Sequence, residues 1–363
     1  MSAADGEQRR ELAAVRPDEE LDWAALEAHL RAELPELAGE FSVLQFPNGA
    51  ANLTYQVRFG QQHLVVRRPP FGSLAPGAHD MHREYRALSK LWRAYDRAPR
   101  ALHYCADPDV IGAEFLVVEY RPGVVVWDAI PPGMADTPDA GRRIGLAVVD
   151  ALVDLHRVDV AAAGLSDLGK PEGFLQRQVA GWRRRWEAVT EPGRNAEMDR
   201  LAELLTDTMP ESGAPTVLHN DFKIDNCQFA PDDPDRVISV FDWDMATLGD
   251  PLVDLGTLLN YWPDPSDDDA TGAMAVRGLD QLGLPTRAEV IERYAAGTGR
   301  DVAAAGWYEA FGCWKTAVVV QQLYARYLRG ETTDERMATR GEQIDGLAWR
   351  ALVLLGHGAT SGP

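Results

Sequence analysis

The sequence predicts an α+β fold in which a β-rich first third precedes a mainly helical remainder. Apolar and polar residues alternate over 53–59 and again over 63–67, which is the two-residue period of β-strands. An apolar strand is expected at 115–120, and helical spacing dominates beyond it. One β segment, at 216–245, interrupts the helical part. Strands that cluster before helices in this way are typical of α+β proteins.

This order of elements divides the chain into three parts. We expect an N-terminal tail and helix at 1–37, a β-rich lobe at 38–120, and a helical lobe at 121–363. Residues 1–18 are polar and predict a weakly ordered tail, whereas the apolar spacing at 21–37 predicts a short amphipathic helix.

Turn-forming residues separate the elements of the β-rich lobe. A loop of small residues at 46–52 leads into the first strand, and Gly60 begins the turn of a hairpin. A breaker-rich loop at 69–80 precedes a helix at about 80–96. The strand that follows ends at Glu119-Tyr120 before an Arg-Pro-Gly sequence, which looks like a hinge.

Within the helical lobe, two segments keep clear helical spacing of apolar residues, at 144–155 and 311–321. The β segment reads as a hairpin, with its turn at 232–235 and its second strand ending near Phe241.

The composition limits the class of function. The 36 Lys and Arg residues against 56 Asp and Glu give a net charge of −20. Nucleic-acid binding is therefore not expected, because it needs clustered positive charge. The acidity suits either a soluble surface or a cationic ligand, and both interpretations stay open.

The three cysteines, Cys105, Cys227 and Cys313, are widely spaced, and no pair has the spacing of a metal site. An odd number of cysteines without a secretion signal favours a reducing compartment. No apolar run approaches the length of a membrane span, so we expect a cytoplasmic protein without a membrane partner.

The strongest chemical signal lies in two segments, His219-Asn220-Asp221-Phe222-Lys223-Ile224-Asp225-Asn226 and Val240-Phe241-Asp242-Trp243-Asp244. These residue types suit phosphoryl transfer. That reaction needs a carboxylate near the acceptor hydroxyl, hard oxygen ligands for Mg²⁺ and a fixed cation. Asp221 is the candidate base, and Asn226 and Asp242 are candidate metal ligands. A hairpin would bring the last two to neighbouring edges.

The two segments resemble the aminoglycoside phosphotransferase family, and they are most similar to the branch sometimes fused to acyl-CoA dehydrogenase domains. The first segment also matches the H-x-D-x-K-x-x-N catalytic loop of protein kinases. The second continues as Met245-Ala246-Thr247-Leu248-Gly249-Asp250-Pro251-Leu252-Val253-Asp254-Leu255. The resemblance implies a protein-kinase-like bilobal fold, with a small β-rich lobe and a larger helical lobe. It also implies Mg²⁺, ATP or GTP as co-substrate, and a hydroxyl of a small molecule as acceptor.

Carried over by motif, the resemblance makes Asp221 the catalytic base and Asn226 and Asp242 the Mg²⁺ ligands. It makes Lys223 a γ-phosphate contact, with a solvated lysine as the alternative. His219 supports the loop, and Asp254 lies in the structural continuation of the metal segment. Asp225 and Asp244 are either surface acids or partners of the site.

The same resemblance assigns nucleotide binding to the β-rich lobe. Arg67 occupies the strand position where the family often has lysine, with Glu84 as its expected ion-pair partner; surface arginines on an edge strand are the alternative. The backbone of the Glu119 and Tyr120 hinge would bind the purine. The loop that contains Asn48, Gly49 and Asn52 is a loose match to the family's phosphate loop.

The acceptor is weakly specified. The basic helix 182–186 could hold an anionic or CoA-bearing substrate, or it could be a solvated face with two buried tryptophans. The acidic positions Asp264, Asp267, Asp268 and Asp269 could attract a polycation, but they read better as an exposed loop. The related branch favours a hydroxylated metabolite, such as a hydroxyacyl compound, over an antibiotic.

Three alternatives stay open beside a small-molecule kinase. An aminoglycoside antibiotic kinase and a nucleotide-binding pseudokinase both fit the motifs. A protein kinase is disfavoured, since Trp243-Asp244 replaces Phe-Gly after Asp242 and no A-P-E tail follows. The sequence leaves the oligomeric state open.

Overall fold

The computed structural model describes residues 12–47, 52–72, 80–190, 195–267, 278–330 and 337–357. The chain forms two compact units. The first comprises Met1–Val124 and Ile238–Ala246, and the second comprises Val125–Val237 and Thr247–Pro363. The first contains a β-sheet and the second is mainly helical, which confirms the predicted α+β class.

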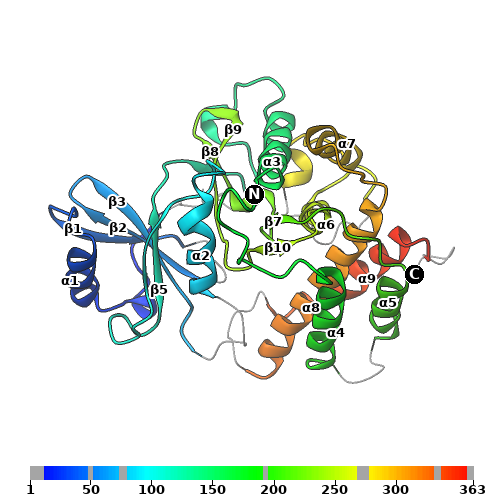
Figure 1. Ribbon diagram of the computed structural model, residues 1–363, viewed down its shortest axis with the longest axis horizontal. Coiled ribbons are helices and arrows are strands. Elements are labelled where there is room, and N and C mark those ends of the chain that lie inside the picture. Colours follow the sequence, from blue (N-terminus) through cyan, green and yellow to red (C-terminus); the bar gives the residue numbers. More distant parts are fainter. Residues whose placement is uncertain are drawn as a thin grey trace, which may run out of the picture. The chain divides into compact units, whose positions relative to one another are not determined.

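The first unit is a five-stranded antiparallel sheet, ordered β1–β2–β3–β5–β4, with one helix on each face (Figure 1). Its elements are α1 (Trp23–Glu33), β1 (Phe41–Gln45), β2 (Leu53–Phe59), β3 (Gln62–Arg68), α2 (Met81–Leu91), β4 (Ala101–Cys105) and β5 (Phe115–Glu119). Leu26 and Leu30 of α1 pack on one face of the sheet, where every second strand residue is buried. The opposite face carries Arg67 toward Glu84 of α2.

The start of the chain corrects one prediction. Residues 12–18 are part of the fold and not of a tail, because Ala13 pairs with Gln45 of β1 and the Tyr55 hydroxyl donates to the Glu19 carbonyl at 2.7 Å. Helix α1 is shorter than the predicted 21–37. Asp22 caps its first turn, and the helix ends before Pro35, as expected from the restriction that proline places on the preceding residue.

Residues 238–246 were assigned by sequence to the helical lobe, but in the structure they belong to the first unit. Two contacts hold them there. The Val240 amide donates to the Arg97 carbonyl at 2.8 Å, and Asp242 forms an ion pair with Arg67.

The second unit is built from seven α-helices in its described residues: α3 (Ala140–His156), α4 (Phe174–Glu187), α5 (Ala196–Asp207), α6 (Leu252–Tyr261), α7 (Arg287–Thr298), α8 (Ala305–Leu328) and α9 (Gln343–Leu354). Its short strands are β7 (Thr216–Leu218), β8 (Cys227–Ala230) and β10 (Thr247–Gly249), and the division between the units falls within β6 (Val124–Val125) and β9 (Asp233–Val240). Helix α8 packs against α4, α6 and α9, and α4 and α8 lie side by side in Figure 1. No helix in the described ranges is both long and apolar enough to cross a membrane.

The hairpin formed by β8 and β9 is confirmed, but its turn lies one residue earlier than predicted. The turn is at 231–232, and Pro234 falls inside β9. Strand β9 is at the edge of the order β6–β8–β9, and an edge strand tolerates a residue that lacks a backbone donor.

Candidate functional site

In the second unit, the segment 219–223 connects β7 to a single 3-10 turn, η3 (Ile224–Asn226). Hydrogen bonds to Asp254 of α6 fix the backbone conformation of this segment. The two carboxylate oxygens of Asp254 accept from the His219 amide at 2.7 Å and from the Asn220 amide at 2.6 Å. Asn220 has φ of 65°, which is a left-handed conformation that asparagine tolerates better than most residues. One buried carboxylate thus holds two consecutive amides of a strained loop.

Asp254 is itself held by a buried chain of polar groups. His156 of α3 lies 3.3 Å from its Oδ2, and the other ring nitrogen of His156 lies 2.7 Å from the Tyr294 hydroxyl. Burial lowers the pKa of His156, so the imidazole is neutral near pH 7. Burial acts to raise the pKa of Asp254, but the hydrogen bonds from His156 and from the loop amides lower it overall.

Lys315 of α8 is a second support of the loop that the sequence analysis did not single out. Its Nζ donates to the Asn220 carbonyl at 2.5 Å and lies 5.8 Å from the centre of the Trp182 ring. Burial lowers the pKa of Lys315, although the charges of Asp221 and Asp254 oppose that shift. Lys315 is 95 positions from Asn220 in the sequence, so no local motif connects it with the loop.

The predicted base, Asp221, lies beside the predicted Lys223 and Asn226. The Asn226 Nδ2 donates to the Asp221 carbonyl at 2.8 Å and to its Oδ2 at 3.2 Å. The Lys223 Nζ lies 3.5 Å from the same Oδ2, and the Asp221 side chain is 27% exposed. The carboxylate is therefore oriented by an amide and a cation, and it remains accessible to a ligand.

Asp225 pairs with Lys223 at 3.4 Å, and Lys223 also lies 5.4 Å from the centre of the Tyr261 ring. Burial raises the pKa of Asp225, and its Oδ1 has no hydrogen-bond partner among the described residues. Asp225 is thus a partner of Lys223 and not a surface acid, which resolves one of the alternatives left open by the sequence.

In the first unit, Arg67 joins two carboxylates from distant parts of the chain. Its Nε donates to Glu84 at 3.1 Å, and its Nη2 donates to Asp242 at 2.5 Å. Glu84 is 1% exposed. Burial disfavours the charged form of Arg67, but the two carboxylates raise its pKa overall. The expected Arg67–Glu84 ion pair is present, and Arg67 is not a surface arginine.

The segment around Asp242 combines a left-handed backbone conformation with a buried tryptophan. Asp242 has φ of 72°, and the indole of Trp243 is fully buried, with its Nε1 donating to the Val240 carbonyl at 2.7 Å. Burial, together with the neighbouring charges of Asp242 and Glu84, raises the pKa of Asp244 to about 8. Three carboxylates therefore share one arginine in this part of the unit, which is an arrangement that favours an additional cation.

The other predicted nucleotide residues differ in how far the structure describes them. Asn52 is buried and donates to Asp244 at 3.4 Å, whereas Asn48 and Gly49 lie outside the described residues. The Glu119 carboxylate is occupied by the Arg100 amide at 3.1 Å and by Arg121 at 3.2 Å. The ring of Tyr120 stacks on His63 with 5.5 Å between centroids.

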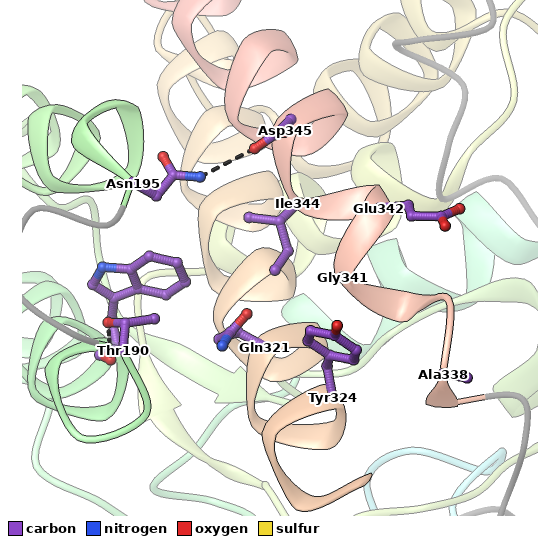
Figure 2. A pocket seen from close by; sticks show the side chains of 10 residues that line it. Thr190, Asn195, Gln321, Tyr324, Ala338, Gly341, Glu342, Ile344 and Asp345 are labelled. Atoms are coloured by element: carbon purple, nitrogen blue, oxygen red, sulfur yellow. Dashed lines mark hydrogen bonds between the residues drawn. The ribbon is translucent and has the colours of Figure 1, made fainter. Parts of the chain in front are cut away.

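A cavity of about 340 Å³ lies within the second unit, between α4, α8 and α9 (Figure 2). Ten residues line it: Trp186, Thr190, Asn195, Gln321, Tyr324, Ala338, Gly341, Glu342, Ile344 and Asp345. Its wall is partly fixed by a hydrogen bond of 3.1 Å from Asn195 to Asp345. Lys315 and Gln321 are six residues apart on α8. The cavity therefore begins about 9 Å along that helix from the support of the catalytic loop.

The burial of side chains on the basic helix agrees with a solvated face that carries two buried tryptophans. Trp182 and Trp186 of α4 are buried, while the three arginines between them are exposed. Of the acidic cluster, Asp264 accepts from the Arg287 amide and Asp267 forms an ion pair with the Arg287 side chain. Asp268 and Asp269 lie outside the described residues.

Comparison with known proteins identifies the family of the chain. The sequence model of the phosphotransferase enzyme family matches residues 42–307. Acyl-CoA dehydrogenase family member 11 of Rattus norvegicus is 32% identical over 357 residues, which cover 95% of this chain and 44% of that protein. Acyl-CoA dehydrogenase family member 10 of Mus musculus is 32% identical over 92% of this chain and 31% of that protein. The chain belongs to the phosphotransferase enzyme family.

Solved structures show the same fold. A Ralstonia eutropha protein assigned to the aminoglycoside phosphotransferases has a TM-score of 0.76 and 28% identity, covering 94% of this chain and all of that one. Aminoglycoside 2'-phosphotransferase-IIIa in its GDP complex has a TM-score of 0.60 at 14% identity, covering 90% of this chain and 98% of that one. The chain therefore belongs to the predicted family and has the predicted kinase-like fold. It spans less than half the length of the curated relatives it matches.

Proposed function

We propose that this phosphotransferase transfers the γ-phosphoryl group of ATP or GTP to a hydroxyl group of a small metabolite. The observation that carries the proposal is the loop 219–226, where one accessible carboxylate lies between an amide and a lysine on a buried scaffold. Asp221 accepts the proton of the acceptor hydroxyl while the oxygen of that hydroxyl bonds to the γ-phosphorus. The bond from that phosphorus to the β–γ bridging oxygen breaks, and the nucleoside diphosphate leaves.

Lys223 and Arg67 supply positive charge in this proposal. Lys223 contacts the transferred phosphoryl group, where its charge is close to Asp221. Arg67 contacts the α- and β-phosphates from β3, and Glu84 fixes its orientation. Among solved relatives, complexes with AMP-PNP, hygromycin B and GDP support a nucleotide and a small molecule as the two substrates.

The residues present fit Mg²⁺. The Asn226 amide nitrogen donates to Asp221, which leaves the amide oxygen as the outward acceptor. Asp242 lies in a group of carboxylates with excess negative charge. Amide and carboxylate oxygens are the ligands that Mg²⁺ prefers, and the ion would neutralise phosphate charge. Asn226 and Asp242 are therefore the proposed ligands.

The acceptor that we favour is an elongated hydroxylated metabolite such as a hydroxyacyl compound. Two observations support it. The cavity of about 340 Å³ can hold an extended substrate arm, and it lies along α8 from Lys315, which contacts the catalytic loop. The relatives 32% identical over most of this chain carry the name acyl-CoA dehydrogenase.

The proposal is tested with a panel of hydroxyl compounds, scored by nucleoside diphosphate release with Mg²⁺ and either ATP or GTP. The panel contains hydroxyacyl compounds, sugars, amino alcohols and aminoglycosides, and Asp221→Ala measures the background. We expect turnover above that background with a hydroxyacyl compound. Turnover confined to aminoglycosides would overturn the acceptor class. Nucleotide binding without turnover of any compound would favour the pseudokinase alternative.

A further inference from the structure

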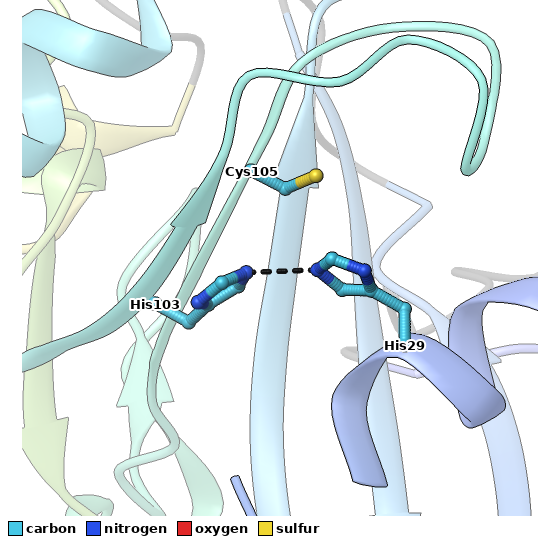
Figure 3. Close-up of side chains that lie close together, drawn as sticks. All are labelled: His29, His103 and Cys105. Carbon is cyan, nitrogen blue, oxygen red and sulfur yellow. Dashed lines mark hydrogen bonds between the residues drawn. The ribbon is translucent and has the colours of Figure 1, made fainter. Parts of the chain in front are cut away.

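A group of potential metal ligands lies in the first unit, away from the residues assigned to nucleotide binding. It consists of His29 on α1 and of His103 and Cys105 on β4 (Figure 3). The ligand atoms of the three side chains all lie within 4.8 Å of one another. The two histidine Nε2 atoms are 2.9 Å apart, so one ring donates to the other in the metal-free state.

We propose that His29, His103 and Cys105 bind a zinc ion that fastens α1 to the sheet. Two imidazoles and one thiolate are ligands that Zn²⁺ prefers over harder divalent ions. In a tetrahedral site with Zn–N of about 2.0 Å and Zn–S of about 2.3 Å, ligand atoms lie roughly 3.3 to 3.6 Å apart. The two Nε2 atoms are closer together than that range, and no separation between the ligand atoms exceeds 4.8 Å, so small side-chain movements close the site. A water molecule takes the fourth position.

The backbone directs the ligands to this point. The pairing of β4 with β5 shifts register between Ala101 and His103, and such a bulge changes the direction of the side chains that follow it. His103 and Cys105 are two residues apart on β4 and share the face that α1 covers. Figure 3 shows both pointing toward His29.

The surroundings favour a cation that is held firmly. Phe115 packs against both imidazoles, with ring centroids 5.6 Å from His29 and 6.2 Å from His103, and so restricts their motion. Glu33 is one turn after His29 on α1, and its negative charge acts on both His103 and Cys105. His29 and His103 are only partly buried, which leaves a path for the ion.

The pKa shifts of His103 and Cys105 act on metal binding in opposite directions. Burial and the neighbouring His29 lower the pKa of His103, which favours the neutral imidazole that a metal needs. Burial raises the pKa of the Cys105 thiol, so metal binding must release its proton to solvent. One proton per ion is therefore expected to appear on binding at neutral pH.

The test uses the full chain, first stripped with a chelator and then titrated with Zn²⁺ by calorimetry and with Co²⁺ by absorption. We expect one equivalent of Zn²⁺ to bind and to raise the unfolding temperature. Bound Co²⁺ should show a near-ultraviolet thiolate-to-cobalt band from Cys105. Because the spectrum is taken on the unmodified protein, this readout does not depend on any variant folding.

Cys105→Ser and His29→Gln locate the site. Each substitution should weaken Zn²⁺ binding by more than about 10- to 100-fold, which is the loss expected when a residue that only contacts a metal ligand is replaced. His82→Gln is the matched control, since His82 is an exposed histidine of the same unit and should leave binding unchanged. The proposal is overturned if Zn²⁺ does not bind, if bound Co²⁺ lacks the thiolate band, or if the ligand variants bind as tightly as the control.

Discussion

At the scale of single residues, Asp254 supports the loop of the second unit that carries Asp221. It is fully buried, and it satisfies the His219 and Asn220 amides while accepting from His156. Hydrogen bonds to a buried charged group stabilise a fold more than neutral ones, and removing one partner leaves the others unsatisfied. The loop that carries Asp221 therefore depends on one carboxylate 33 positions further along the chain.

Replacing that carboxylate tests its role. Asp254→Asn should lower the free energy of unfolding by about 2 to 4 kcal/mol. The asparagine side chain has one acceptor oxygen, whereas the backbone amides of His219 and Asn220 each need an acceptor. Urea denaturation measures the change. Asp150→Asn is the matched control, since Asp150 forms an exposed ion pair with Arg293 and should cost less than about 1 kcal/mol. Equal costs for the two variants would contradict the assigned role.

His156 gives the fold a dependence on acid. Its pKa in the folded chain lies below the ordinary value of 6.5, so the unfolded chain takes up the proton first as the pH falls. Stability should therefore decrease below about pH 6.5, by at most about 1.4 kcal/mol per pH unit from this group. The lowered pKa of Asp254 adds a further loss at more acidic pH.

Unfolding free energies measured between pH 7.5 and about pH 5 should fall less steeply for His156→Gln than for the wild type. His82→Gln removes an exposed histidine and should keep the wild-type slope. A wild-type slope in His156→Gln would show that His156 is not buried in its neutral form.

In the first unit, Arg67 is the residue whose replacement tests the proposed nucleotide site. Arg67→Ala should raise the KM for ATP by about 10- to 100-fold, because hydrogen bonds to charged groups contribute about 1.5 to 3 kcal/mol. Arg67→Lys keeps the charge but loses the paired donors, so its KM for ATP should lie between the values of the wild type and of Arg67→Ala. Arg58→Ala, an exposed arginine on β2, is the control. An unchanged KM in Arg67→Ala would place the phosphate-binding cation elsewhere.

At the scale of elements, the close contact of α6 with α8 holds Asp254 and Lys315 in one rigid frame. A side chain on Gly256 would put its Cβ 2.2 Å from the Tyr308 carbonyl, and one on Gly312 would lie 2.7 Å from the Gly256 carbonyl. Each helix thus requires a glycine opposite the other. Asp254 of α6 and Lys315 of α8, which both support the loop, therefore belong to helices that share one packing interface.

Gly256→Ala should therefore destabilise the protein by about 1 to 3 kcal/mol or more, since the neighbouring backbone cannot yield. Gly306→Ala on α8 is the control, because its nearest neighbour would be 3.6 Å away and the change should stay within about 1 kcal/mol. Thermal unfolding distinguishes the two. Equal unfolding temperatures would show that α6 and α8 are further apart than described.

The elements that could be predicted from sequence are those with a strong local period. The hairpin of β2 and β3 follows directly from alternation, as α8 does from helical spacing. Strands β1 and β4 were not predicted, because neither has the continuous apolar run of β5 or the clear alternation of β2, and β4 pairs through a bulge. Element boundaries moved where proline decided them, as at the end of α1.

The candidate site shows the same limit. The motif residues Asp221, Lys223 and Asn226 are within six positions of one another and could be predicted from spacing. Lys315 and His156 could not, because they reach the loop and Asp254 across separations of 95 and 98 residues. The ligands of the proposed zinc site are similarly distant, with His29 and His103 separated by 74 residues.

At the scale of the whole molecule, the residues that we propose for phosphoryl transfer are divided between two compact units. The first unit carries Arg67, Glu84 and Asp242, and the second carries Asp221, Lys223 and Asn226. The chain matches less than half the length of its curated relatives. We propose that this chain performs a complete phosphoryl transfer by itself.

The most direct test compares Asp221→Asn with the wild type, using the acceptor found in the panel. Phosphorylated product and nucleotide affinity are measured on the same preparations. Because a general base contributes about 10² to 10⁴ in rate, kcat should fall by that factor while the dissociation constant for the nucleotide stays within about threefold. An unchanged kcat in Asp221→Asn would contradict the assignment of Asp221 as the base.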